Sequence, residues 1–153
     1  MSTPRKPSDR PLRYQTVLNM EQTMLALNAA FETALSEFGL GLAQWDTLRQ
    51  LRDHPGASGA EIARLVKVTP QAVATMLQRL EKAQLITRRE AATGRVVKTY
   101  LTPQSELLLQ KGEQIAEQIE ARAFSAFSAE EKEQFNHHLH QCIASLNETK
   151  PPH

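Results

Sequence analysis

The sequence predicts a mainly α-helical protein with one small β-hairpin, and three features of residues 58–102 lead to this fold class. A short helix is expected to begin at Ser58, because Ser-Gly-Ala-Glu is a Ser-x-x-Glu capping box that satisfies the first free amides of a helix. A second helix is expected to begin at Thr69, an N-cap hydroxyl followed by a proline that suits the first helical position. Two β-prone runs, 85–89 and 96–101, then flank a turn at Gly94. Two helices followed directly by such a hairpin are the plan of a winged helix-turn-helix.

The second of these helices is predicted to have one apolar side and one polar side. Its apolar residues recur at the i, i+3, i+4, i+7 spacing of a stripe that faces a core: Val73, Met76, Leu77 and Leu80. Its other side carries hydrogen-bonding, mostly uncharged residues with two cations: Gln71, Thr75, Gln78, Arg79 and Lys82. A helix that enters a DNA major groove and meets base edges is expected to present such a face.

Charge is segregated along the chain, although its formal net value is only +1. From Arg64 to Lys98 there are eight Lys or Arg and two acidic residues, a balance of +6, whereas residues 103–148 have three basic and eight acidic residues, a balance of −5. The cations crowd the predicted hairpin: Arg88, Arg89, Arg95 and Lys98. This segregation indicates one surface suited to phosphate. Taken alone, this charge segregation would be explained equally well by charged faces that are simply exposed to solvent.

The most characteristic local pattern is the run LEKAQLITRR at residues 80–89, followed by Arg95 and by Leu-Thr at 101–102. It resembles the MarR family of bacterial transcription factors, which usually has Leu-Glu-x-x-Gly-Leu-Ile-x-Arg, then Asp-x-Arg, five residues and Leu-Thr; the resemblance covers nearly the whole chain. Gln84 stands at the family glycine, so the helix is expected to end without the left-handed cap that glycine forms without strain. Thr93 replaces the wing aspartate, which removes the usual carboxylate partner of Arg95.

Eleven polar residues of the predicted DNA-binding head, residues 41–102, are assigned a role at double-stranded DNA. Gln71, Thr75 and Gln78 are the base-reading candidates, because Gln can contact adenine with two hydrogen bonds and the Thr methyl can pack on thymine. Arg95, at the wing tip, is the candidate for the minor groove. The DNA backbone is expected to meet the remaining polar and cationic residues: Ser58, Thr69, Arg79, Lys82, Arg88, Arg89 and Lys98.

The segments on either side of the head are predicted to form a helical dimerisation region. Residues 14–40 and 103–148 carry long apolar stripes at helical spacing, and a second capping box at Ser128 begins the last helix. A helix that buries about five large apolar side chains gains roughly 8–15 kcal/mol of transfer free energy, and this stabilisation is lost if that face is exposed to water. The simplest way to cover these apolar faces is to pack them against the same helices of a second chain related by a two-fold axis. The predicted organisation is therefore a disordered basic arm at 1–13, the dimerisation region, and a DNA-binding winged helix-turn-helix at 41–102.

The family resemblance implies a cytoplasmic repressor that binds a pseudo-palindromic operator as a homodimer and is released by a small, often aromatic, acid. Trp45, Arg49, Arg52 and His54 lie on the helix nearest the family's ligand region, but packing and surface charge explain them better. Trp45, the only tryptophan, is expected to be a core residue. No ligand-binding residue, metal or cofactor is assigned. The chain has no apolar run of membrane-spanning length and no signal peptide, which also favours the cytoplasm.

Other classes of function compete with this interpretation. Cys142 is the only cysteine, and its place on an apolar stripe predicts a small buried hydrophobe rather than a thiol sensor. His137, His138 and His140 are suggestive of a metal sensor, but solvated histidines on an exposed face explain them better. No phosphate-binding loop, nucleophile elbow or His-Glu-x-x-His motif indicates an enzyme. A winged-helix adaptor between proteins is the remaining alternative.

Overall fold

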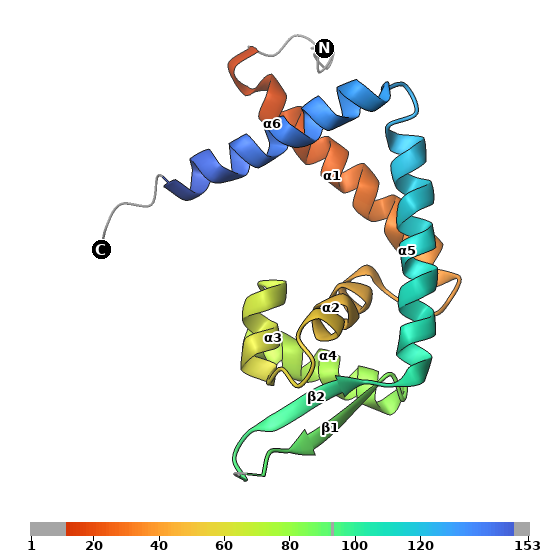
Figure 1. The fold of residues 1–153 in the computed structure, drawn as a ribbon, viewed down its shortest axis with the longest axis vertical. Coiled ribbons are helices and arrows are strands. Elements are labelled where there is room, and N and C mark those ends of the chain that lie inside the picture. Colours follow the sequence, from red (N-terminus) through yellow and green to blue (C-terminus); the bar gives the residue numbers. More distant parts are fainter. Residues whose placement is uncertain (1–11, 93, 149–153) are drawn as a thin grey trace, which may run out of the picture. The chain divides into compact units, whose positions relative to one another are not determined.

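The computed structural model describes residues 12–92 and 94–148, and within them the fold is mainly helical with a two-stranded antiparallel wing. The elements follow one another as α1 (Leu12–Ser36), α2 (Leu42–Asp53), α3 (Gly59–Val66), α4 (Pro70–Lys82), β1 (Ile86–Glu90), β2 (Val97–Leu101), α5 (Pro103–Ala123) and α6 (Ala129–Glu148) (Figure 1). The predicted fold class is confirmed. Since α1 begins at Leu12, it takes in the last two residues of the arm predicted to be disordered, and the rest of that arm lies outside the described residues.

Two compact units divide the chain, residues 1–116 and 117–153. In the first unit, the core of the head lies among α2, α3, α4 and the strands. It is built of side chains that are almost fully buried: Leu48, Leu51, Ile62, Leu77, Leu80 and Ile86. Val73 is buried and Met76 is half-buried, so the predicted stripe of α4 does face this core.

The predicted caps of α3 and α4 are both present. Ser58 Oγ accepts a hydrogen bond from the Glu61 amide at 3.3 Å, and the Ser58 amide donates to Glu61 Oε2 at 2.7 Å. Thr69 Oγ1 accepts from the Ala72 amide at 3.2 Å, and Pro70 occupies the first turn of α4. These bonds satisfy amides that have no partner inside the helix. Both helices of the helix-turn-helix therefore begin at the residues that the sequence predicts.

The wing has a third backbone segment that the sequence pattern did not predict. β1 and β2 pair antiparallel, with Arg88 opposite Thr99. On the other edge of β2, the Thr99 amide donates to the Ala57 carbonyl at 3.2 Å, and the Gly56 amide donates to the Thr99 carbonyl at 2.9 Å. The loop between α2 and α3 thus continues the sheet and fixes the wing to the head.

Within residues 12–92 and 94–148, two residues other than glycine adopt the left-handed backbone conformation, and both lie at helix ends. Lys67 has φ 55° after α3, and Gln84 has φ 59° after α4. The prediction that this helix ends without a left-handed cap is therefore wrong, because Gln84 adopts the left-handed conformation although it is not a glycine. A residue with a Cβ is strained there by roughly 1–2 kcal/mol. The substitution changes the energy of this helix end and leaves its geometry in place.

A small hydrogen-bond cluster joins the end of the wing to the start of α5. Thr102 Oγ1 donates to the Gln84 carbonyl at 2.8 Å, and the Thr102 amide donates to the Leu85 carbonyl at 3.1 Å. The Thr102 amide also donates to Ser105 Oγ at 3.0 Å, and the buried Ser105 hydroxyl donates to the Thr102 carbonyl at 2.7 Å. The Leu-Thr pair therefore fastens the strained end of α4 to the first turn of α5.

The second unit contains the end of α5 and α6. Three aromatic rings, those of Phe124, Phe127 and Phe135, contact one another with centroids 5.4–5.8 Å apart. The capping box at Ser128 is confirmed by bonds in both directions with Glu131. No residue of α6 is buried within one chain, and Cys142 is exposed. The prediction of a buried Cys142 is therefore wrong for the single chain, because its stripe has no cover there.

Candidate nucleic-acid interface

The outer side of α4 is a polar face that the single chain leaves uncovered. All five polar residues predicted there are exposed: Gln71, Thr75, Gln78, Arg79 and Lys82. The face exists because the buried stripe of the same helix turns it outward. Its middle is uncharged, and its two cations both lie in the last turn of the helix.

Hydrogen bonding leaves different groups of this face available to a ligand. Thr75 Oγ1 donates to the Gln71 carbonyl at 3.2 Å, so its hydroxyl proton is used and its methyl is left for an apolar contact. Within the described part of the chain, the side-chain amides of Gln71 and Gln78 make no hydrogen bond. Each amide can therefore offer both a donor and an acceptor to a base edge.

The wing carries four exposed cations in different electrostatic surroundings: Arg88, Arg89, Arg95 and Lys98. An ion pair joins Arg88 to Glu81 at 3.8 Å, and the Arg89 guanidinium lies 6.0 Å from the centre of the Tyr100 ring. Among the described residues, Arg95 has no such partner. Thr93, the residue at the family aspartate, lies outside the described residues. Lys98 likewise has no ion pair among these residues, although its charge acts on Glu61. Arg95 and Lys98 are thus the two wing cations without an ion-pair or ring partner in the described residues.

The two N-cap hydroxyls differ in what they can offer to a phosphate. Ser58 Oγ donates its proton to Glu61 Oε2 at 2.8 Å, and the hydrogen bonds from Ser58 hold the pKa of Glu61 below its ordinary value. The Ser58 hydroxyl is therefore occupied while this box is closed. Thr69 Oγ1 accepts one bond and keeps its proton. This arrangement favours Thr69 over Ser58 as a donor to a DNA phosphate.

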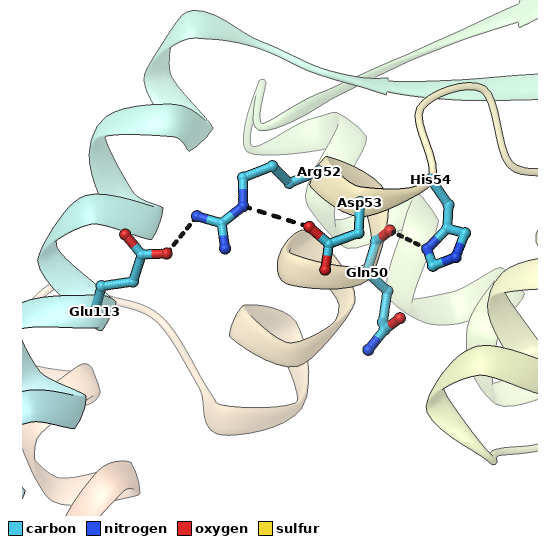
Figure 2. Close-up of polar contacts among 5 residues, drawn as sticks. All are labelled: Gln50, Arg52, Asp53, His54 and Glu113. Atoms are coloured by element: carbon cyan, nitrogen blue, oxygen red, sulfur yellow. Dashed lines mark hydrogen bonds and ion pairs between the residues drawn. The ribbon is translucent and has the colours of Figure 1, made fainter. Parts of the chain in front are cut away.

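The four residues of α2 and its C-cap that the sequence places near a family ligand region all take part in packing, ion pairs or hydrogen bonds within the chain. Arg52 forms an ion pair with Glu113 of α5 and lies 3.8 Å from Asp53, while His54 Nδ1 is 3.1 Å from the Gln50 carbonyl (Figure 2). Trp45 is 5% exposed, so its predicted core position is confirmed. Its ring stacks on Phe31 with centroids 5.6 Å apart. The Arg49 guanidinium lies 4.9 Å from the Trp45 ring.

Two open hollows in the first unit were not foreseen from the sequence. One, of about 510 Å³, lies along the loop between α2 and α3 and along α3: its lining includes His54, Glu61, Arg64 and Leu65. The other, of about 630 Å³, lies behind α4 between α2 and the turn after α3: its lining includes Asp46, Gln50, Val68, Val73 and Met76. Hollows of this kind depend on how helices meet, which a one-dimensional pattern does not record.

The histidines of α6 do not gather into a recognisable metal site in the described residues, which hold no group of three or more metal-binding side chains. The rings of His137 and His138 lie 5.8 Å apart, and His138 Nδ1 is 3.1 Å from Gln141 Oε1. Nor does any helix in the described ranges have the length and apolar character needed to cross a membrane.

Comparison with known proteins points to the same family as the wing pattern. The MarR family model matches residues 38–95. The HTH-type transcriptional repressor Rv2887 of Mycobacterium tuberculosis is 33% identical over 132 residues, which make up 86% of this chain and 92% of the repressor.

Two crystal structures of the Mycobacterium tuberculosis protein resemble the fold described above. Its complex with DNA has a TM-score of 0.71 at 30% identity and covers 88% of this chain and 98% of that chain. Its complex with salicylic acid has a TM-score of 0.68 at 32% identity and covers 88% of this chain and 97% of that chain. The similarity therefore extends beyond the head to nearly the full length of both proteins.

Proposed function

Since this chain belongs to the MarR family of winged helix-turn-helix transcriptional regulators, which are not enzymes, we propose that it is a repressor that binds a pseudo-palindromic operator as a homodimer. The observation that carries this proposal is the outer face of α4, which is exposed, hydrogen-bonding and uncharged at its centre, with the cationic wing following in the same head. In a DNA complex, such a helix reads base edges while cations hold the backbone.

Roles on DNA follow from which groups are available. Gln71 and Gln78 are proposed to read bases through their amides, and Thr75 through its methyl. Arg95 is proposed to enter the minor groove. The backbone is proposed to be held by Thr69 and the remaining cations of the head, namely Arg79, Lys82, Arg88, Arg89 and Lys98, with Ser58 contributing only if its capping box opens.

The homodimer is proposed from apolar residues that the single chain leaves exposed. Val17, Met24 and Leu25 of α1 and Ile143 of α6 all lie mostly in water. A second copy would cover these residues and would set two α4 helices roughly 34–36 Å apart, the length of one DNA turn. The arrangement of the two copies is part of the proposal.

A small aromatic acid is proposed as the signal for release, because the related mycobacterial protein forms a complex with salicylic acid. Such a ligand can dissociate DNA only if it binds more tightly to a head spacing that differs from the DNA-bound one. Titrating salicylic acid into the protein–DNA complex tests this directly. We expect release by salicylic acid and none by acetic acid, which has the carboxylate without the ring. Equal responses to both acids would contradict the proposal.

The test of DNA reading compares Gln78→Ala with Lys82→Ala, two changes on exposed positions of the same helix. Gln78→Ala should weaken binding to a duplex selected from random sequences by about 1–3 kcal/mol, roughly 5- to 150-fold, and weaken binding to random DNA much less. Lys82→Ala should weaken both alike and lower the salt slope by about one. An equal loss on both kinds of DNA would show that Gln78 reads no base. Binding that does not depend on salt would favour a protein adaptor over a DNA-binding regulator.

A further inference from the structure

Helix α5 meets α2 where the indole ring of Trp45 lies directly against the α5 backbone. Gly112 is a buried glycine inside α5, and it faces the indole of Trp45 on α2. A Cβ placed on Gly112 would lie 2.0 Å from Trp45 Nε1 and 2.6 Å from Trp45 Cδ1. Atoms cannot approach this closely, so any side chain at residue 112 would push the two helices apart.

Trp45 has little freedom to yield to such a side chain. The ring is 5% exposed and stacks on Phe31 at an interplanar angle of 23°. Its Nε1 is buried without a hydrogen-bond partner among the described residues. Glycine also weakens the interior of a helix relative to alanine. The chain therefore keeps two locally unfavourable features at the place where α5 lies against α2.

The residues on either side of Gly112 hold the same part of α5. Glu113 forms the ion pair with Arg52 that joins α5 to α2 (Figure 2). That hydrogen bond raises the pKa of Arg52 further above its ordinary value, which favours the charged guanidinium. On the other side, Lys111 Nζ lies 4.7 Å from the centre of the Phe38 ring. Three consecutive residues of α5 thus contact Phe38, Trp45 and Arg52.

We propose that this contact fixes the direction in which α5 leaves the head and so selects the half-site spacing that the dimer accepts, with Gly112 and Arg52 as the specificity-determining residues. The inference rests on the proposed function, because spacing has a meaning only for a dimer on two half-sites. It differs from a role in stability alone: a change at the contact should alter which spacing binds best, and not only how tightly the protein binds.

The test measures binding of the full-length protein to a series of duplexes whose half-sites are moved apart or together by one or two base pairs. Wild type should prefer one spacing, since each added base pair also rotates one half-site about the DNA axis. Gly112→Ala should shift the preferred spacing by about one base pair or abolish the preference. Arg52→Ala should flatten the preference by roughly two- to fivefold, the range expected for a partly exposed ion pair. Exchanging the charges in Arg52→Glu/Glu113→Arg should restore it.

Asp53→Ala is the matched control, because it removes the longer ion pair of Arg52 that stays within α2 (Figure 2). It should leave the spacing profile as in wild type. Alanine favours a helix more than glycine does, so a shift in Gly112→Ala cannot be assigned to a weaker α5. If Gly112→Ala fails to fold, Arg52→Ala and the exchange variant decide the question.

The possible failures are distinguishable. A wild-type protein that binds every spacing equally would contradict the proposed palindromic dimer itself. A wild-type protein with a clear preferred spacing that remains unchanged in Arg52→Ala and in folded Gly112→Ala would overturn the inference while leaving the proposed function intact.

Discussion

Helices α4 and α6 both carry an apolar stripe at helical spacing, but the two stripes have different surroundings in the structure. In α4, Leu77 and Leu80 are 1% and 0% exposed, and the polar residues face outward. In α6, no residue is buried within one chain, and Ile143 is 56% exposed. A periodic apolar stripe therefore says which side of a helix requires a cover. It does not say whether that cover belongs to the same chain.

The two regions should consequently respond differently to the loss of apolar contacts. The head has its own core, so its stability depends on contacts within the chain. The proposed dimer contacts of α1 and α6 depend on protein concentration, because they require a second copy.

The largest expected effect is that of Leu80→Ala in the head. Leu80 is fully buried, so its truncation should lower the free energy of unfolding by about 2–5 kcal/mol. Chemical denaturation at low and at high protein concentration should give the same loss. A loss below about 1 kcal/mol would mean that the core described here is not the one that stabilises the head.

The next effect is that of Ile143→Asp on α6, which should weaken the dimer by about 1–2 kcal/mol per chain, because the 56% of Ile143 that is exposed in one chain can no longer be buried favourably. Sedimentation should show monomers at concentrations where wild type is dimeric, while circular dichroism retains the helical signal. Gln134→Asp is the control, because residue 134 is nine positions away and lies on the opposite side of the helix. If Ile143→Asp sediments as wild type does, this face is not the dimer contact.

A smaller effect with the opposite sign is expected from Gln84→Gly. Gln84 has φ 59°, a conformation in which glycine is unstrained, so the substitution should raise the free energy of unfolding by about 1 kcal/mol. Thermal or chemical denaturation measures the change. Gln110→Gly, inside α5, should instead lower stability by about 1 kcal/mol. Destabilisation by Gln84→Gly would show that the glutamine side chain makes a contribution that outweighs the strain.

The smallest effect concerns the capping box of α3 and its pH dependence. Hydrogen bonds from Ser58 hold the pKa of Glu61 below its ordinary value in the folded protein. A group with a lowered pKa stabilises the fold above its unfolded-state pKa, and this stabilisation is lost as the pH falls through the folded-state pKa. Glu61→Gln should therefore reduce the loss of stability between neutral and acidic pH. Identical pH profiles for the two proteins would rule out this contribution.

Much of the head could be predicted from sequence because its signals are local. The caps at Ser58 and Thr69 involve residues three apart, and the stripe of α4 follows from helical periodicity alone. The pairing of Ala57 with Thr99 could not be predicted, because two backbone hydrogen bonds from a loop leave no side-chain pattern. The contact of Gly112 with Trp45 joins residues far apart in the chain, and a single glycine in a helix carries no sign of its partner.

For the outer helices, the sequence predicts the apolar stripe but not which chain covers it. The stripe of α6 was recognised, but burial of Cys142 was inferred from it as though the cover were part of the chain. For the nucleic-acid interface, exposure of Gln71, Thr75 and Gln78 followed from the opposite face of the same helix. The occupied hydroxyl of Ser58 depends on where the Glu61 carboxylate lies, which only coordinates provide.

Sedimentation of the protein with labelled duplexes tests most directly whether two chains bind one DNA molecule, each through the exposed face of its α4. Two chains should bind a duplex with two half-sites, and binding to a duplex with one half-site should be far weaker. A single chain bound to either duplex with equal affinity would contradict this prediction.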